Sequence, residues 1–411
     1  MATTHWATTR TEEQLVNDAK TLFTSTYDEE PTGVWAAPGR VNLIGDHVDY
    51  AEGICLPFAL EQLTAIAAAG RNDHVVNIIT VMPGQDEPQR LSMSLEEVGK
   101  GNPATWAGYV VGVIWALNSS NALVCKTGMD IAVVSDVPVG SGLSSSAALE
   151  CSTALAAVDV KGSSFRKMAM YPVMVEATMR AENDVVGAST GGLDQRTSFY
   201  GKKNQALEID FLYDEFTYVP CNFADHGLAV LVADTNAPHR LIDGQYGSRR
   251  GLIDEVTAVL RKEDSTFRDF TVEQVLELLA KTSECSDHDL YRRRVGHVIS
   301  ETQRTQHAVS CLRDGDFSKF GKLMIESHAS LRDDYAVVTP ELDCAVNAAL
   351  SAGALGARMT GGGFGGSIIA LVKKENMEST AQSIAEAAEA RGFEAPTFLE
   401  ARPGHGARRL A

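Results

Sequence analysis

A loop rich in glycine and serine carries the most specific chemistry in this chain. Its sequence, VPVGSGLSSSAA from Val137 to Ala148, lies between an expected strand and an expected helix. Gly140 and Gly142 allow a close backbone approach that other residues prevent. The helix begins among serines, so its free N–H groups and partial positive charge suit an anion such as phosphate. The loop lacks the lysine of a Walker A motif, and a serine-capped helix after a glycine turn is the plain alternative.

A second segment, APGRVNLIGDHVDY from Ala37 to Tyr50, places four charged or titratable groups in a short loop between apolar runs. These groups are Arg40, Asp46, His47 and Asp49. Carboxylates bind the adjacent hydroxyls of a sugar through paired, charge-assisted hydrogen bonds. A solvated turn is the alternative, because Asp and Asn favour turns. A metal site would need a third ligand, and none follows nearby in sequence.

A third segment, from Met359 to Gly366, has glycine at five of the six positions after Thr360. Ordering that much glycine is entropically costly, so a plain turn of this composition is unusual. We expect this backbone to pack against a ligand or against another loop, with a flexible hairpin as the alternative.

The elements that position these segments follow from apolar periodicity. Strands are expected at 34–37, 54–59, 65–69, 75–81, 131–135, 228–234 and 367–372. Helices are expected at 11–27, 106–117, 145–158, 165–183, 247–262, 271–280, 289–313, 316–330, 340–353 and 379–391. The elements mix without strict β–α–β alternation, which favours an α+β fold. A chain of 411 residues suggests two domains, 1–220 and 221–411.

Composition narrows the classes of partner. The chain has 54 acidic and 36 basic residues, a net charge of −18. Such a surface repels nucleic acid and anionic membranes, so we expect neither as a partner. It repels ATP as well, and a nucleotide site must therefore supply its own local attraction.

Cysteine usage and hydropathy indicate a cytoplasmic protein. The seven cysteines show no CxxC pair, and an odd number favours reduced thiols over a disulfide framework. The first 18 residues lack the apolar stretch of a signal peptide. No run of about 18 apolar residues occurs, so we expect no membrane span.

In their order and spacing, the three segments resemble the motifs of the GHMP kinases, which include galactokinase, homoserine kinase and mevalonate kinase. The run GRVNLIG from Gly39 to Gly45, followed by His47, Asp49, Tyr50 and Leu56-Pro57, is similar to the galactokinase signature. Further similarities lie at Trp106-Ala107, Tyr109, Gly192 to Gln195, Asn236 to Tyr246 and Arg249-Arg250.

The resemblance implies a fold and an activity. Residues 1–220 would be similar to the ribosomal protein S5 domain 2-like fold, and residues 221–411 would be ferredoxin-like, with the active site between them. The implied activity is galactokinase: ATP phosphorylates α-D-galactose at its C1 hydroxyl in galactose catabolism by the Leloir pathway. ATP and Mg²⁺ would be the cofactors, and we expect a monomer or a weak homo-oligomer.

The resemblance also assigns roles to single residues. Asp194 matches the family's proposed general base beside the C1 hydroxyl, and Arg40 matches the arginine that pairs with it. Ser146 and Glu182 match the positions that hold Mg²⁺. The nucleotide contacts would be Pro138, Gly140, Ser141, Gly142, Leu143, Ser144, Ser145, Ser146, Ala147 and Ala148.

The sugar contacts implied by the resemblance are Asp46, His47, Asp49, Gly191 and Tyr246. Asp49 would bind the ring hydroxyls that distinguish galactose from glucose. Asp46 would meet the C6 hydroxyl, and Tyr246 the same end of the sugar.

Several positions depart from the galactokinase pattern, and most lie on the sugar side. Asp46 stands where these kinases typically carry Glu. The other departures are Val48, Ala51-Glu52, Ser189-Thr190 and Arg196. One alternative is therefore a sister kinase for L-arabinose or for a galactose altered at C2 or C6. Another is a catalytically dead sugar sensor, against which the intact residues Arg40, Ser146, Glu182 and Asp194 argue.

Overall fold

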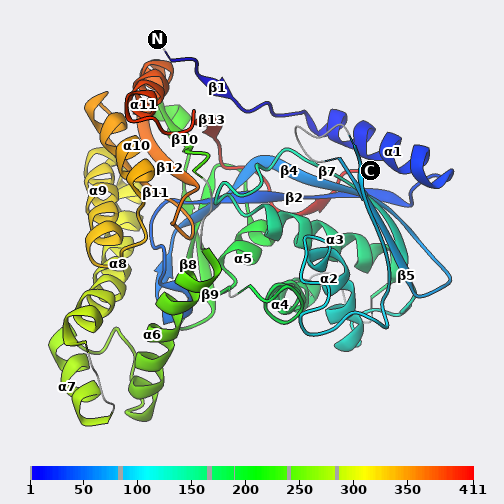
Figure 1. Ribbon diagram of the computed structural model, residues 1–411, viewed down its shortest axis with the longest axis horizontal. Coiled ribbons are helices and arrows are strands. Elements are labelled where there is room, and N and C mark those ends of the chain that lie inside the picture. Colours follow the sequence, from blue (N-terminus) through cyan, green and yellow to red (C-terminus); the bar gives the residue numbers. More distant parts are fainter. Residues whose placement is uncertain (1, 82–86, 164–168, 189, 238–241, 283–286) are drawn as a thin grey trace.

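Two β-sheets organise the fold, and helices cover their faces (Figure 1). The computed structural model describes residues 2–81, 87–163, 169–188, 190–237, 242–282 and 287–411. Of residues 242–246 and 282, only the backbone is described. The mixture of helices and sheets confirms the predicted α+β class.

The larger sheet belongs to the N-terminal half and has six strands. In spatial order they are β14 (Arg408–Arg409), β2 (Gly33–Asn42), β4 (Pro57–Gly70), β7 (Met129–Ser135), β5 (Val75–Thr80) and β6 (Gln89–Ser94). Strand β7 lies between β4 and β5 and pairs with both. The strands predicted at 65–69 and 75–81 lie in β4 and β5. They do not pair with each other, because β7 lies between them.

Both faces of the central strands β2, β4 and β7 are buried, because apolar residues continue along them rather than alternating with polar ones. Helix α1 (Glu12–Tyr27) covers one face, and α2 (Gly108–Ser119) and α3 (Ser145–Lys161) cover the other. Along β2, Val34 and Ala36 pack towards α1. Trp35 and Ala37 point the opposite way, into the core beneath α2 and α3. A continuous apolar strand of this kind needs a covering layer on each side.

Three further elements lie on the α3 side of this sheet. They are α4 (Met170–Arg180), the π-helical turn η3 (Ala181–Val186) and α5 (Leu193–Tyr200). The helix predicted over 165–183 is present as α4 from Met170, and at Ala181 the chain widens from it into η3. Residues 164–168 lie outside the described residues. π turns inside helices often accompany functional sites.

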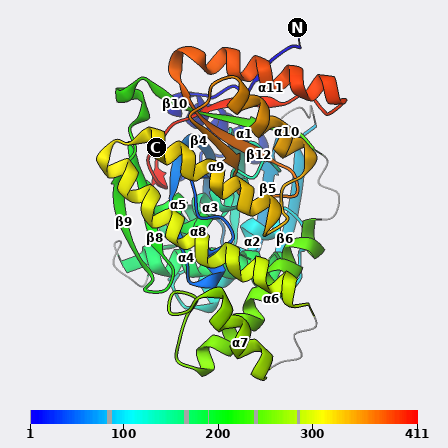
Figure 2. The ribbon, with the colours of Figure 1, turned by 90° about the vertical axis from the view of Figure 1, so that its left-hand side faces the viewer.

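The second sheet has five strands in the C-terminal half. Their order is β1 (His5–Trp6), β13 (Thr397–Ala401), β10 (Leu228–Asp234), β12 (Ser367–Lys373) and β11 (Gly356–Met359). The helices of this half are α6 (Ile242–Lys262), α7 (Val272–Thr282), α8 (His288–Asp314), α9 (Phe317–Asp333), α10 (Pro340–Ser351) and α11 (Met377–Arg391). Figure 2 shows α8 to α11 spread over the face of the molecule turned to the viewer.

A small third sheet lies within residues 1–220, and the two chain ends tie the halves together. The sheet consists of β3 (Ile54–Cys55), β8 (Gln205–Asp210) and β9 (Glu215–Pro220). Near the N-terminus, β1 pairs with β13 of the C-terminal sheet, whereas β14 near the C-terminus pairs with β2 of the N-terminal sheet. A division near residue 220 remains a prediction, and both ends of the chain cross it.

The halves also share one hydrophobic cluster. It contains Val41 and Phe58 from the larger sheet and Val230 and Ile369 from the smaller one, all fully or almost fully buried. The second sheet thus presses one face against the ends of β2 and β4. Within the described residues, no helix is both long enough and apolar enough to cross a membrane.

Candidate active site

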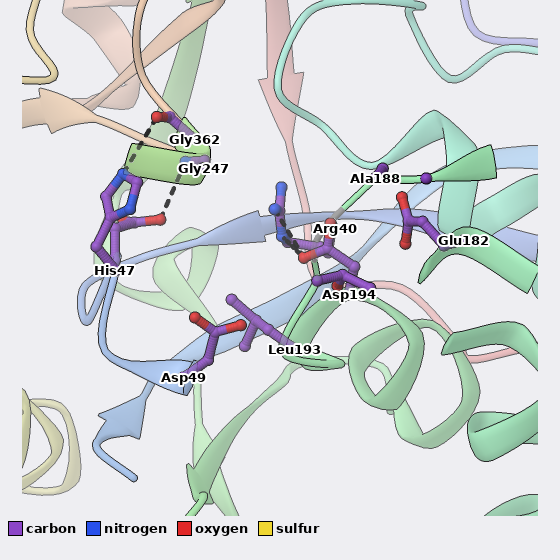
Figure 3. Close-up of a pocket in the computed structure, with 13 residues that line it drawn as sticks. Arg40, His47, Asp49, Glu182, Ala188, Leu193, Asp194, Gly247 and Gly362 are labelled. Carbon is purple, nitrogen blue, oxygen red and sulfur yellow. Dashed lines mark hydrogen bonds and ion pairs between the residues drawn. The ribbon is translucent and has the colours of Figure 1, made fainter. Parts of the chain in front are cut away.

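A cavity of about 270 Å³ lies where the two halves meet (Figure 3). Its walls come from the loop after β2, from η3, from the start of α5, from α6 and from the glycine-rich loop after β11. The lining residues are Arg40, Asp46, His47, Asp49, Glu182, Gly187, Ala188, Thr190, Leu193, Asp194, Gly247, Gly361 and Gly362. Residues of the second and third segments, together with Glu182 and Asp194, are therefore brought together around one space.

Arg40 contacts both Asp194, which lines the cavity, and the loop from Val137 to Ala148. Its Nε and Nη2 lie 2.8 and 2.7 Å from Oδ1 of Asp194. Its Nη1 donates to the carbonyl of Gly142 at 2.6 Å, and its backbone N–H donates to the carbonyl of Leu143. The planar guanidinium can satisfy these partners at once, which the ammonium of a lysine could not. Arg40 therefore fixes Asp194 relative to the loop.

Ser144 holds the other oxygen of the same carboxylate. Its hydroxyl donates to Oδ2 of Asp194 at 2.5 Å. Ser144 is the N-cap of α3, yet it adopts a left-handed conformation, with φ of 60°, and its side chain caps no N–H of its own helix. The hydroxyl is thus directed to Asp194 instead of the helix. Both oxygens of Asp194 are engaged, which keeps this carboxylate in one orientation.

The loop from Val137 to Ala148 joins β7 to α3, as the sequence predicts. Gly140 and Gly142 have φ of 75° and 76°, values that an L-residue adopts only under strain. Since no side chain caps α3, its first N–H groups can donate hydrogen bonds to an anion. The prediction that this loop binds phosphate has its physical basis here.

The second glycine-rich segment packs against this loop. A Cβ on Gly361 would lie 2.9 Å from the carbonyl oxygen of Gly142, and one on Gly366 would lie 3.1 Å from that of Ser141. The hydroxyl of Ser367 donates to the same Ser141 carbonyl at 2.6 Å. Of the alternatives open for this segment, the structure shows packing against another loop. Glycine is needed because two backbones meet with no room for side chains.

Glu182 faces the cavity from η3, close to the start of α3. Its Oε1 accepts the hydroxyl of Ser146 at 3.3 Å, and its Oε2 accepts Nε2 of Gln195 at 2.6 Å. Burial and the nearby charge of Asp194 raise the pKa of Glu182 to about 7. An oxygen-only pair beside a phosphate loop suits Mg²⁺, which prefers few protein ligands completed by phosphate and water. A divalent cation would also stabilise the ionised form of this carboxylate.

Asp49 lies in the short helical turn η1 (Asp49–Ala51) and packs against Gly191. A Cβ on Gly191 would come within 2.2 Å of Oδ2 of Asp49, so any other residue there would displace the carboxylate. Burial and the charge of Asp194 raise the pKa of Asp49 to about 6. Gly191 thus acts by leaving room for Asp49 at the edge of the cavity.

His47 is held as a neutral imidazole. Its Nε2 lies 3.1 Å from the carbonyl of Gly362, which can only accept, so Nε2 carries the proton. Its Nδ1 then accepts the hydroxyl of Tyr50 at 3.0 Å. Burial lowers the pKa of His47 to about 3. Because both nitrogens are engaged, and no cluster of three candidate ligands occurs in the described part of the chain, a metal centred on His47 and Asp49 finds no support.

Asp46 is oriented by the C-terminal half. Its Oδ1 accepts the N–H of Gly361 at 3.1 Å, and its Oδ2 lies 2.6 Å from Nη2 of Arg358. Arg358 is fully buried on β11, with Glu301 behind it. Asp46 lines the cavity while its carboxylate is anchored in the wall. Its contact with a sugar hydroxyl stays a prediction.

Two predicted positions cannot be placed. The side chain of Tyr246 lies outside the described residues, although its neighbour Gly247 lines the cavity. Ser189, one of the departures from the galactokinase pattern, also lies outside them.

A second cavity of about 290 Å³ opens beside the phosphate loop. It is lined by Thr64, Thr80, Trp106, Tyr109, Val133, Ser135, Val139, Gly140, Ser145, Ser146 and Leu149. Its lining is largely apolar and includes the aromatic side chains of Trp106 and Tyr109. Ser146 lines this cavity and also touches Glu182 of the first one. The two cavities therefore meet at the start of α3.

Comparison with known proteins agrees with this geometry. The galactokinase galactose-binding signature matches residues 21–70, and the GHMP kinase N-terminal and C-terminal domains match residues 108–202 and 308–392. A galactokinase of Streptomyces coelicolor is 39% identical over 388 residues, 94% of this chain and 97% of that protein. This chain belongs to the galactokinase family. Human galactokinase is 40% identical over 88% of each chain.

Solved structures place the galactokinase-family chain in the same fold. The galactokinase of Lactococcus lactis complexed with galactose has a TM-score of 0.85 at 29% identity, covering 96% of this chain and 99% of that one. A mevalonate kinase has a TM-score of 0.60 at 18% identity over 90% and 98% of the two chains, which shows the shared GHMP kinase architecture. Membership makes this protein a kinase with ATP as its phosphate donor.

Some residues of this galactokinase-family site are not found by sequence reasoning. Arg358 and Glu150 are fully buried charged residues, and neither stands out within its apolar segment. The carboxylate contact of Ser144 depends on the fold, because Asp194 lies 50 positions away. Charge alone does not mark Glu150 in advance, since α3 also contains the charged residues Asp159 and Lys161.

Proposed function

We propose that the protein is an ATP-dependent galactokinase that converts α-D-galactose and ATP to galactose 1-phosphate and ADP in galactose catabolism. One observation carries the proposal: Arg40 and Ser144 hold Asp194 between the acidic cavity and the phosphate loop. A hydroxyl bound next to Asp194 would face a phosphoryl group bound at the start of α3. The galactokinases named above, one of them complexed with galactose, support galactose as the sugar.

In this reaction Asp194 accepts the proton of the C1 hydroxyl. The C1 oxygen forms a bond to the γ-phosphorus as the bond from that phosphorus to the β-bridging oxygen breaks, and ADP leaves. Arg40 favours the ionised carboxylate and offers positive charge beside the transferring group. Phosphoryl transfer has a loose transition state that needs little activation of the nucleophile. Asp194 therefore acts by orienting the hydroxyl as well as by accepting its proton.

The nucleotide site would extend across both cavities. The phosphates would lie on the free N–H groups of α3, within the loop from Pro138 to Ala148, and the adenine in the apolar cavity near Trp106. Ser146 and Glu182 would hold Mg²⁺, which when bound neutralises charge on the phosphates. Such a site supplies the local attraction that an acidic protein needs in order to bind ATP.

The sugar would lie between the loop after β2 and the segment before α5. Asp49 would accept hydrogen bonds from the sugar hydroxyls, and Gly191 leaves room for its carboxylate. His47 lines the cavity beside it, with its ring held by Gly362 and Tyr50. Asp46 and Tyr246 complete the proposed contacts. We place the enzyme in the cytoplasm, as a monomer, without a nucleic-acid or membrane partner.

A coupled ADP-release assay with ATP, Mg²⁺ and galactose tests the proposal. We expect turnover with galactose and a loss of about 100-fold or more in Asp194→Ala, the usual range for removing a group that handles a proton. Galactose binding without turnover would contradict the proposal and favour a sugar sensor. Turnover confined to N-acetylgalactosamine, galacturonate or L-arabinose would instead favour a sister kinase, for which the anchored Asp46 is the first residue to examine.

A further inference from the structure

Gln195 lies beneath the candidate metal position and belongs to none of the predicted roles. It follows Asp194 on α5, and its side chain is fully buried. Its Nε2 donates to Oε2 of Glu182 at 2.6 Å and to Oε2 of Glu150 at 3.0 Å. One amide group therefore stands between two carboxyl groups.

This arrangement fixes which way the amide points. Both neighbours present carboxyl oxygens, and only the NH₂ end of Gln195 has two hydrogens to give them. The opposite orientation would set the amide oxygen against two acceptors. Methionine has a similar size but gives no hydrogen, and glutamate would add a third carboxylate. Glutamine is the residue that suits this position.

Glu150 holds the amide from behind. It lies one turn after Ser146 on α3 and is fully buried. Within the described residues its Oε1 has no hydrogen-bond partner, and neither does Oε1 of Gln195. Two buried polar atoms without partners are unusual and destabilising, which is typical of sites kept for function.

Glu150 contacts Gln195, Gln195 contacts Glu182, and of these three residues Glu182 lines the cavity. Ser146 contacts its Oε1 and Gln195 its Oε2, so the carboxylate is held from two sides while it lines the cavity. Figure 3 shows Glu182 directed towards Ala188 and the cavity. Rotation of this side chain would break the contact with Gln195.

We propose that Gln195 is a positioning residue, braced by Glu150, that orients Glu182 towards the divalent cation of the proposed kinase reaction. The inference rests on the proposed function of Glu182. Two adjacent residues of helix α5 would then have different roles: Asp194 contacts the sugar, and Gln195 orients the Glu182 carboxylate that binds the metal. Residues that orient metal ligands typically change metal affinity by about 10- to 100-fold when they are replaced.

Metal binding measured apart from turnover tests this role. Mn²⁺ serves as the probe, with its binding followed by electron paramagnetic resonance in the presence of a non-hydrolysable ATP analogue. For Gln195→Met we expect the Kd for Mn²⁺ to rise about tenfold or more, with the Kd for galactose within twofold of the native value. Thr197→Val is the matched control, because it removes a buried hydroxyl from the same helix, and that hydroxyl donates to the carbonyl of Leu193 within α5. It should leave both constants unchanged.

The double variant Gln195→Met/Glu150→Met covers the case in which the single variant does not fold. It removes the second buried carboxyl along with the amide, and the same rise in the Mn²⁺ Kd is expected. An unchanged Mn²⁺ Kd in a folded variant would overturn the inference, as would an equal loss of Mn²⁺ and galactose binding. Since neither measurement requires turnover, failure of the proposed galactokinase activity would be seen separately.

Discussion

At the scale of single residues, the site is defined by carboxyl groups in unlike surroundings. Asp194 has Arg40 and Ser144 as partners, whereas burial and the Asp194 charge raise the pKa values of Asp49 and Glu182. Closely placed carboxylates resist simultaneous ionisation. The free protein therefore holds protons near neutral pH that a bound cation at Glu182 or sugar hydroxyls at Asp49 would displace.

Galactose binding should follow the ionisation of Asp49. Its raised pKa of about 6 means that the free protein holds a proton there below pH 6 and loses it above. Only the ionised carboxylate accepts two charge-assisted hydrogen bonds from sugar hydroxyls. We expect the Kd for galactose, measured by calorimetry without nucleotide, to be constant above pH 7 and to rise about tenfold per pH unit below pH 6.

Two variants identify the group that titrates. Asp49→Asn should bind galactose weakly at every pH, with no transition near pH 6. Asp194→Asn removes the charge that helps to raise the pKa of Asp49, so the transition should move to lower pH. A transition near pH 6 that persists in Asp49→Asn would assign it to another group.

At the scale of elements, long apolar patterns are predicted well and short polar elements are not. The strand predicted at 228–234 coincides with β10, and the helix predicted at 289–313 differs from α8 by one residue at each end. Helix α5 has only eight residues and no apolar stripe, so nothing in its sequence indicates a helix. Strand β9 carries the β-prone run FTYV at 216–219 but is exposed at most of its positions, and it is not among the predicted strands.

In the candidate site, too, some features can be predicted from the sequence and others cannot. The motifs predict which residues surround the cavity, because Arg40 and Asp49 belong to one recognisable sequence segment. Contacts between distant segments could not be predicted, such as the anchoring of Asp46 by Arg358 across 312 positions. They depend on how the two sheets pack, and periodicity within one segment contains no information about that packing.

The contact between the two glycine-rich loops can be tested through Gly366. It has φ of 76°, and a Cβ there would lie 3.1 Å from the carbonyl oxygen of Ser141. In Gly366→Ala we expect a stability loss of about 1–2 kcal/mol from the left-handed backbone. Displacement of the phosphate loop should also raise the KM for ATP several-fold. Chemical denaturation and steady-state kinetics measure the two effects.

Gly392 provides the control for backbone strain alone. It ends α11 with φ of 70°, and a Cβ there would meet nothing within 4 Å. Gly392→Ala should lose similar stability and keep the native KM for ATP. If both variants changed this KM equally, the effect would come from general destabilisation and not from contact between the loops.

At the scale of the whole molecule, the site depends on the two halves being held as one body. The shared hydrophobic cluster joins the sheets, and each end of the chain pairs with the sheet of the opposite half. The cavity walls come from both halves, with Arg40 on one side and Gly361 on the other. Orientation of the sugar relative to the phosphate loop is therefore built into the fold.

The net charge of −18 predicts how kcat/KM for ATP depends on salt concentration. The first cavity is lined by one arginine and four acidic residues, so the local charge has the same sign as that of the whole protein. Mg·ATP is an anion, and the protein's field repels it over the Debye length, which falls from about 30 Å at 0.01 M salt to about 8 Å at 0.15 M. At saturating Mg²⁺, kcat/KM for ATP should rise at least about twofold over this range.

Galactose is neutral, so its kcat/KM should stay constant and serves as the internal control. A fall in kcat/KM for ATP would mean that Arg40 and the start of α3 dominate the field where the nucleotide enters.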